Sequence, residues 1–191
     1  MVQALPGTTI ELDERRWSEG EEVLDCLFLA GGLTLSQVAQ LTGLEPHVIQ
    51  NWVKRGFLPP PNGRKYNKNQ FCRLALMNML RSTLPLPQIT ALLSYLNGVL
   101  ADGSDDIIDD FQLYCYVLRL SPWAERNPLA RKAQWDEQCQ AVLHDYQGPY
   151  PGAELRVAQG LRIILTAYTA ARLGDMALTM AKALQEGSDM K

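Results

Sequence analysis

The chain has 191 residues, of which 47% are hydrophobic and 20% are charged, and its formal net charge is −3. These values are ordinary for a soluble globular protein, and the length allows one compact unit or two small ones with a sizeable core. Residues 1–10 lack the basic and apolar regions of a signal peptide, and no apolar run reaches the roughly 20 residues that span a bilayer, so we expect a cytoplasmic protein without a membrane segment.

The N-terminal extension is predicted to cover residues 1–32. Its first 16 residues are expected to form a loose polar lead-in, with Trp17 packing on the body. A short helix over Glu21–Leu29 follows, and the breaker pair Gly31-Gly32 ends it.

Two short helices come next and predict a helix-turn-helix. Thr34 and Gln37 have the spacing of a capping box, in which each side chain bonds the backbone N–H of the other residue. Gly43 is typical of a helix-ending glycine. Pro46 lies in the first turn of the second helix, where a missing N–H costs little, and Gly56 closes that helix. The apolar stripe of the second helix comprises Leu44, Val48, Ile49, Trp52 and Val53.

A small β wing is predicted after the second helix. Pro59–Pro61 exclude a helix or a central strand, and Asn62-Gly63 is typical of the turn of a tight hairpin. Residues 64–66 would then form the return edge, with two cations at the tip. Asn67 and Gln70 predict the start of another helix, which runs to Ser82 and is apolar on most sides.

The rest of the chain is predicted to be helical, because no segment after the wing alternates like a strand. Helices are expected from Pro85 to about residue 100, from a cap at Ser104, from Ser121-Pro122 toward residue 146, and over residues 152–186, where Gly174-Asp175 can interrupt the last one; residues 101–104 would be a linker. The expected fold is therefore all-α with a minimal β wing. A winged helix-turn-helix domain (33–100) precedes a helical C-terminal domain (104–191) for effector binding or dimerisation.

The charges are segregated along the sequence. Residues 34–82 contain seven Lys and Arg but only one acid, Glu45, so this segment carries +6 and the rest of the chain carries −9. A basic segment on an acidic protein is the pattern expected of a polyanion contact confined to one face.

Several short motifs occur in a characteristic order: Val38-Ala39, Leu41-Thr42-Gly43, Gly56-Phe57-Leu58-Pro59-Pro60, Arg64-x-Tyr66, and a helix with Ile89, Leu92 and Leu93. This order resembles the DNA-binding module of MerR-type regulators. The string from Asn51 to Pro61, with Lys65-Tyr66, is similar to a bacterial family of unknown function built on that module, which also has a tryptophan before it, as Trp17 is here, and a helical C-terminal half.

The sequence departs from the MerR pattern at three places. The recognition-helix positions hold Gln50, Asn51, Trp52 and Val53 in place of an Arg-Tyr-Tyr-Glu-like run, and Gly63 replaces the aromatic residue before the wing arginine. MerR proteins dimerise through one long helix directly after the module, but Gly98 and Gly103 interrupt that route here. A dimer would therefore use a different interface.

The resemblance implies double-stranded DNA as the partner, with helix 46–55 in the major groove and wing 62–66 on the flanking backbone or minor groove. Gln50 and Asn51 suit adenine, and Arg64 at the wing tip suits the minor groove. Trp52 is expected in the core, and Tyr66 suits either wing packing or a phosphate contact. The full predicted DNA-binding set is Ser36, Gln37, His47, Gln50, Asn51, Lys54, Arg55, Arg64, Lys65 and Tyr66.

The sequence thus predicts a MerR-like DNA-binding transcriptional regulator. The alternative is a protein-interaction module whose helix-turn-helix no longer binds DNA. An enzyme is not expected, because no nucleophile elbow, phosphate loop or supported acid pair is present. A homodimer and a small-molecule or protein effector at the C-terminal half are further partners left open.

No metal and no cofactor are expected, because the four cysteines and two histidines lack metal-ligand spacing. A sensor site at Cys115, Cys139 and His144 is the alternative interpretation. The aromatic residues of the second half suit core packing better than a ligand pocket; they are Tyr114, Tyr116, Trp123, Trp135, Tyr146, Tyr150 and Tyr168.

Overall fold

The computed structural model describes residues 2–98 and 106–188, and it is mostly helical, with 66% helix and 6% strand. This confirms the helical class expected from the sequence. The helices are α1 (Gly20–Leu27), α2 (Leu35–Thr42), α3 (Pro46–Lys54), α4 (Lys68–Leu80), α5 (Leu86–Asn97), α6 (Asp110–Arg126), α7 (Lys132–Val142), α8 (Ala153–Ser188) and the 3₁₀ helix η1 (Glu14–Glu19). The strands are β1 (Val2–Ala4), β2 (Glu11–Asp13), β3 (Leu33–Thr34) and β4 (Lys65–Tyr66).

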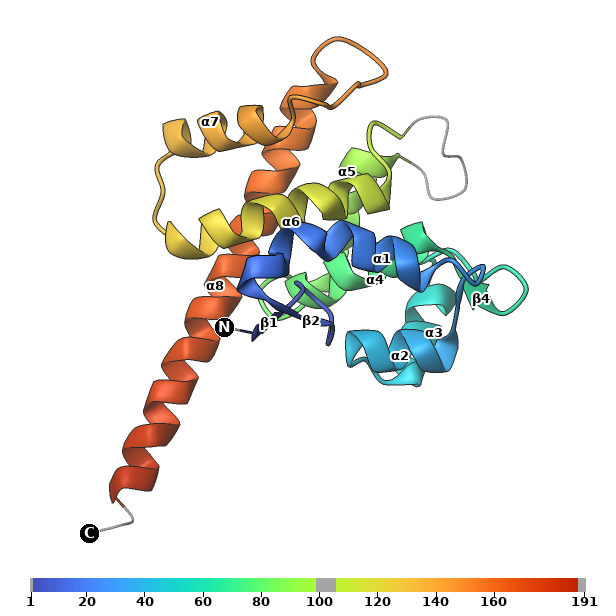
Figure 1. The fold of residues 1–191 in the computed structure, drawn as a ribbon. Helices are drawn as coiled ribbons and strands as arrows, with labels where there is room; N and C mark the ends of the chain where they lie inside the picture. Colours follow the sequence, from blue (N-terminus) through green and yellow to red (C-terminus); the bar gives the residue numbers. More distant parts are fainter. Residues whose placement is uncertain (1, 99–105, 189–191) are drawn as a thin grey trace.

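Helix α4 lies at the centre of the fold. Its residues 70–77 are all buried, which agrees with the apolar pattern on most of its sides. One hydrophobic cluster runs from Leu5 through α4 and α6 to Tyr168 of α8, so the three segments expected from the sequence share a single core. Figure 1 shows α4 and α6 between the α2–α3 pair on one side and α8 on the other. None of the described helices combines the length and apolar character needed to cross a membrane.

The N-terminal segment is ordered, so the expected loose lead-in was wrong. Strands β1 and β2 form an antiparallel hairpin with Gln3 paired to Leu12. Leu5 is buried, and the Tyr114 hydroxyl donates to the Pro6 carbonyl at 2.6 Å. Sequence pattern alone misses this hairpin because a two-stranded ribbon is marginal in water and depends on the body beneath it.

Helix α6 continues through Pro122, so a new helix starting at Ser121-Pro122 was also wrong. A proline inside a helix cannot donate to the carbonyl four residues earlier, here that of Leu118. Two side chains donate to this oxygen instead: Trp17 Nε1 at 2.9 Å and Ser121 Oγ at 3.1 Å. Trp17 therefore packs on the body as expected. It also supplies a hydrogen bond to the carbonyl that the proline leaves without its helical donor.

Two other helix boundaries differ from the sequence predictions. Helix α6 begins at Asp110 rather than after Ser104, because Asp109 is extended and its side chain accepts from the Gln112 amide at 2.8 Å. Helix α8 runs through Gly174-Asp175 without a break, since glycine weakens a helix by only about 1 kcal/mol and blocks no hydrogen bond. The predicted linker over residues 101–104 lies outside the described residues.

Candidate nucleic-acid interface

The start of α2 is fixed by the capping box expected from the sequence. The Thr34 hydroxyl accepts from the Gln37 amide at 3.4 Å, and the Gln37 side-chain oxygen accepts from the Thr34 amide at 2.9 Å. Ser36 and Gln37 are exposed in this first turn. Free backbone N–H groups at a helix N-terminus favour anions, so this end of α2 is suited to a phosphate.

Helix α3 has one buried face and one polar face. Ile49 and Trp52 are buried, which confirms Trp52 as a core residue. The preceding Gly43 has the left-handed φ of +67° expected of a helix-ending glycine, and Pro46 occupies the first turn. The opposite face presents five exposed side chains from the predicted set, namely His47, Gln50, Asn51, Lys54 and Arg55. These are the donors and acceptors that a groove-binding helix presents to base edges.

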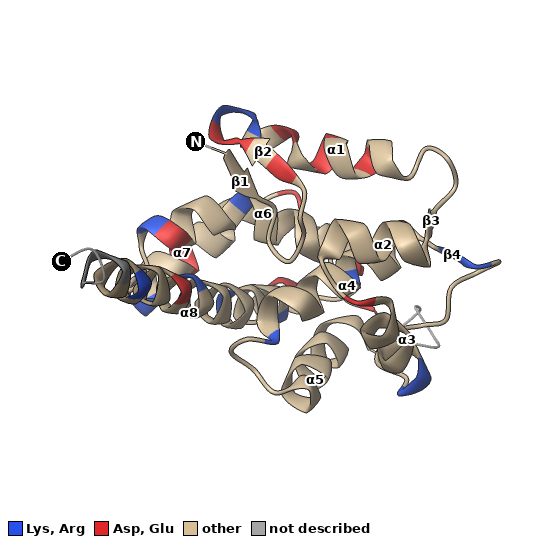
Figure 2. Ribbon diagram, turned by 90° about the horizontal axis from the view of Figure 1, so that it is seen from below, with Lys and Arg blue, Asp and Glu red and all other residues tan. Residues whose placement is uncertain are grey.

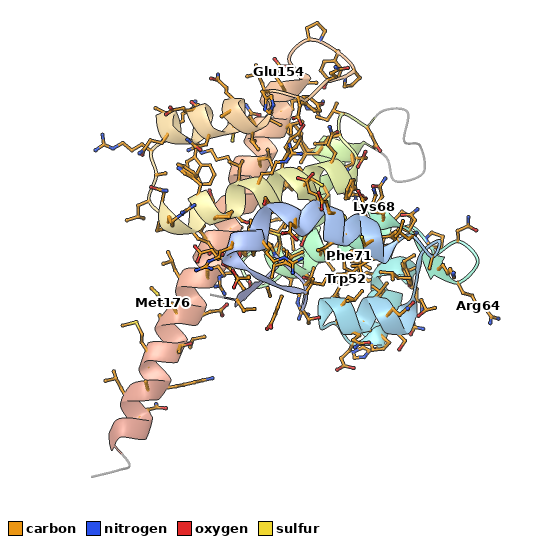
Figure 3. The ribbon with its side chains drawn as sticks, in the orientation of Figure 1. Trp52, Arg64, Lys68, Phe71, Glu154 and Met176 are labelled. Atoms are coloured by element: carbon orange, nitrogen blue, oxygen red, sulfur yellow. The ribbon has the colours of Figure 1, made fainter. Side chains whose placement is uncertain are left out.

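The wing is a tight turn that projects Arg64. Lys65 N donates to the Asn62 carbonyl at 2.9 Å, and the two central residues, Gly63 and Arg64, have φ angles of +54° and +65°. These angles and the bond match a type I′ turn. Arg64 is the one non-glycine residue with positive φ in the described chain. Figure 3 shows it at the tip of the wing, pointing away from the body.

The tight turn of the wing forms as predicted, with an isolated antiparallel bridge between Asn62 and Lys65. The prediction did not include a second pairing, in which strand β4 pairs with β3, the strand before α2. The register sets Tyr66 opposite Leu33 and Lys65 opposite Thr34, the cap of α2. The wing cation Lys65 is therefore brought beside the start of α2, with its ammonium 3.2 Å from the Ala30 carbonyl.

Nine of the ten predicted DNA-binding side chains are exposed, and Tyr66 is not. Tyr66 is only 3% exposed and belongs to the hydrophobic core, so wing packing is the role the structure gives it. Burial also raises the pKa of its phenol. Its alternation with Lys65 along β4 explains this placement, because neighbouring strand residues face opposite sides.

Two of the seven cations in the basic segment are used internally. Arg73 is 1% exposed and pairs with Asp110, while Lys68 pairs with Asp25 and lies over the Phe111 ring. Four others are exposed and make no ion pair with any side chain in the part of the chain that the structure describes: Lys54, Arg55, Arg64 and Lys65. We call these four residues the basic set.

The basic set lies at one end of the molecule. Figures 1 and 2 both place the end of α3 and strand β4 at the end opposite to the free tip of α8. The ribbon in Figure 2 marks the acidic residues of α1 in red, away from β4 and the end of α3. Glu21 and Asp25 of α1 form ion pairs with Arg119 and Lys68. The positive charge of the basic set is therefore not neutralised by α1.

Sequence reasoning missed a buried polar cluster behind α3. Arg73 Nη1 lies 3.3 Å from Asp110 Oδ1, and Asn97 Nδ2 donates to the same oxygen at 2.9 Å. Arg73 Nε donates to the Phe57 carbonyl at 3.1 Å, just after α3. The cluster therefore ties the exit of α3 to the start of α6. The signal that could have revealed it is an arginine within a helix that is apolar on most sides, because a buried cation needs a counter-charge.

The stability of this cluster should depend on pH. Burial raises the pKa of Asp110 from 3.8 to about 6, against the opposing attraction of Arg73. Between these two values the folded state binds more protons than the unfolded state, so the stability due to this group falls as pH rises through that window. Relative to an Arg73→Met/Asp110→Leu variant, we expect the wild type to lose roughly 2 kcal/mol of unfolding free energy from pH 4.5 to pH 7. Urea titrations of both proteins at the two pH values measure this change. If the difference in unfolding free energy between the wild type and the double variant is the same at both pH values, the prediction is contradicted.

The aromatic and cysteine residues of the C-terminal half are mainly structural. Trp123 and Trp135 pack edge to face with ring centroids 4.8 Å apart, and the Tyr116 hydroxyl donates to Asp145 at 2.9 Å. Burial raises the pKa of Cys139 to about 11, which disfavours its reactive thiolate. Over residues 2–98 and 106–188, no three His, Cys, Asp or Glu side chains are grouped closely enough to hold a metal ion.

Comparison with known families places the candidate interface inside a family segment. Residues 30–116 match a family model described as a domain of unknown function (DUF1836). This segment begins before β3 and ends within α6, so it contains the basic set and also both members of the Arg73–Asp110 pair.

The chain is also similar to a bacterial protein over part of its length. The chain is 34% identical over 91 residues to the uncharacterised protein YkrK of Bacillus subtilis (strain 168). The aligned region covers 44% of this chain and 39% of the relative, so the chain spans about two-fifths of the length of the relative it matches. No solved structure shows significant similarity to the chain.

Proposed function

We propose that the chain is a DNA-binding transcriptional regulator whose residues 33–100 form a MerR-like winged helix-turn-helix. The observation that carries the proposal is the basic set: four exposed cations, without ion pairs in the described chain, on α3 and the wing. Double-stranded DNA is a polyanion that such cations bind by releasing counterions.

Helix α3 supplies the base contacts in this proposal. Its buried face, with Ile49 and Trp52, fixes the helix on the body, and its opposite face presents Gln50 and Asn51 to the major groove. Each amide can pair with N6 and N7 of adenine in a bidentate manner. Lys54 and Arg55, at the end of the same helix, are suited to the adjacent phosphates.

The wing and the start of α2 supply the backbone contacts. The register of β3 and β4 places Lys65 beside the α2 cap, so a phosphate there meets both a cation and a helix N-terminus. Arg64 lies at the tip of the wing, where the turn gives it a positive φ that is unfavourable for a non-glycine residue. Its side chain is suited to the flanking minor groove. Backbone strain of this kind is often kept at functional positions.

A mobility-shift titration tests the proposal. With the four cations of the basic set neutralising the DNA charge, binding of random duplex should weaken roughly 100-fold between 50 and 200 mM salt, because each cation contributes about 0.9 to the salt slope. Arg64→Ala and Lys54→Ala should each lower affinity for all sequences and reduce the slope by about 0.9. Lys182→Ala removes the same charge from the exposed end of α8 and should change neither.

Two outcomes of this titration would contradict the proposal. Absence of binding at low salt, or binding that Arg64→Ala and Lys54→Ala leave unchanged, would overturn the DNA-binding proposal. It would favour the alternative, a protein-interaction module built on the same helices.

A further inference from the structure

The C-terminal half of α8 projects from the body and exposes several large apolar side chains. Figure 1 shows this half extending beyond the other helices, and Figure 3 labels Met176 on it. Leu173, Met180 and Leu184 are 42%, 63% and 75% exposed. A helix of this length gains most of its stability from packing, so the exposed apolar side chains suit this half to packing against a partner.

The exposed apolar residues follow a heptad pattern. Seven exposed positions recur at alternating spacings of three and four, and we call them the outer seam: Ile163, Thr166, Ala170, Leu173, Ala177, Met180 and Leu184. This is the spacing that brings two helices together as a coiled coil. The seam begins where α8 still packs on the body and continues to the projecting end.

The outer seam is not an extension of the intramolecular core. Ile164 is fully buried against the body and lies nine residues before Leu173, which is about two and a half helical turns. The two side chains therefore point to opposite faces of α8. Val157 and Leu184 are related in the same way, so the helices of this chain that cover Val157 cannot also cover Leu184. Body residues reach only the margins of the seam, where Glu125 and Pro128 line a pocket with Leu173 and Met180.

We propose that the outer seam pairs in antiparallel orientation with the outer seam of a second copy of this chain. In a register centred on Asp175, Leu173 of one copy faces Ala177 of the other, Ala170 faces Met180, and Thr166 faces Leu184. Each layer then combines one large and one small side chain, as a close-packed interface requires. Because a two-fold axis relates the two copies, each layer occurs twice, and two identical sequences form a complementary interface.

The charges on α8 agree with self-pairing. Between residues 166 and 184, the positions that flank the seam are all uncharged: Ala167, Thr169, Gly174, Met176, Ala181 and Ala183. Asp175 and Lys182 lie on the face of the helix opposite to the outer seam, in line with the buried Ile164. A highly charged partner would find no counter-charges along this stretch, whereas depletion of charge is typical of homodimer cores. Arg162 flanks Ile163 only at the body end of the seam.

A groove at the body end of the seam extends this interface. It has a volume of about 650 Å³ and is lined by Thr83 and Leu84 from the α4–α5 turn and by Ile163, Thr166 and Ala170 of the seam. In the proposed register the partner's Leu184 lies opposite Thr166. The end of the second helix would therefore enter this groove.

Light scattering after size exclusion tests the proposal with a matched pair of variants. Met180→Glu and Leu178→Glu place the same charge on side chains that are 63% and 62% exposed, but only Met180 belongs to the seam. At micromolar concentrations the wild type and Leu178→Glu should be dimers. Met180→Glu should be a folded monomer, with association weakened about 100-fold. A monomeric wild type, or an equal effect of the two variants, would overturn the proposal.

Disulfide cross-linking tests the orientation. In a Cys26→Ser background, which removes the exposed cysteine, an equimolar mixture of Leu173→Cys and Ala177→Cys chains should cross-link to each other more readily than either does to itself. Preferential self-cross-linking of each variant would show a parallel pair and would overturn the antiparallel register. Neither measurement depends on DNA binding.

Discussion

Asp110→Leu should lower the free energy of unfolding by about 3–5 kcal/mol, because it removes the counter-charge of a buried arginine. Arg73 is 1% exposed, so its charge would remain buried without a counter-charge. The substitution also removes the acceptor of the Asn97 amide. Urea denaturation at pH 7 measures the loss.

Arg73→Met should cost less than Asp110→Leu, because the remaining carboxyl group can take up a proton. Burial already raises the pKa of Asp110 to about 6 with the arginine in place. The double variant Arg73→Met/Asp110→Leu should recover most of the lost stability, since apolar side chains of similar volume often replace a buried ion pair at little cost. A double variant as unstable as Asp110→Leu would show that the charge pair is not the cause.

The Arg73–Asp110 pair also connects the candidate interface to the rest of the fold. Arg73 Nε holds the Phe57 carbonyl, which follows the end of α3. The Asp110 carboxylate lies in the first turn of α6, at the entrance to the C-terminal half. A change in the C-terminal half that moved the start of α6 would act on α3 through this cluster.

The parts of the interface that the sequence predicts are those set by local interactions. The capping boxes at Thr34 and Asn67, the glycine at position 43 and the proline at position 46 each act within one helical turn. Helical periodicity then separates the buried Trp52 from the exposed Gln50 and Asn51, so the polar face of α3 is correctly predicted.

The features that the sequence does not reveal depend on residues far apart in the chain. Strands β3 and β4 lie before α2 and after α3 in the sequence, and no local pattern predicts that they pair with each other. Helix α6 tolerates Pro122 because Trp17, more than 100 residues earlier, donates to the free carbonyl. The Arg73–Asp110 pair likewise joins residues 37 positions apart. Such contacts follow from the fold and cannot be read from spacing.

The N-terminal hairpin shows the same limitation and also supports the interface. Thr9 Oγ1 donates to the Gln40 carbonyl and Thr9 N to the Leu41 carbonyl, both at 2.8 Å. Asn78 Nδ2 bridges the carbonyls of Gly7 and Thr42 at 2.9 and 2.8 Å. The hairpin turn therefore holds the end of α2 against α4, just before the turn into α3.

Gly7→Ala should destabilise the fold by about 2–5 kcal/mol, combining an overpacking cost of about 1–3 kcal/mol with left-handed backbone strain of about 1–2 kcal/mol. Gly7 has a φ of +72°, and a Cβ atom there would lie 2.0 Å from the Ala75 carbonyl oxygen of α4. The Cβ atom would be fixed to the backbone of the turn, and the Ala75 carbonyl belongs to the backbone of α4, so neither could rotate away. The hairpin turn would therefore have to move away from α4. Urea denaturation should report the loss.

Gly63→Ala is the matched control for this prediction. Gly63 has a φ of +54°, but nothing lies within 4 Å of a Cβ atom at this position, so only the backbone strain of about 1–2 kcal/mol is expected. Hydrogen exchange should separate the two variants further. Gly7→Ala should expose the amides at the end of α2, whereas Gly63→Ala should affect only the wing. Equal costs for the two variants would mean that the turn at Gly7 does not pack on α4 in solution, and the hairpin would then lose its role in positioning α2 and α3.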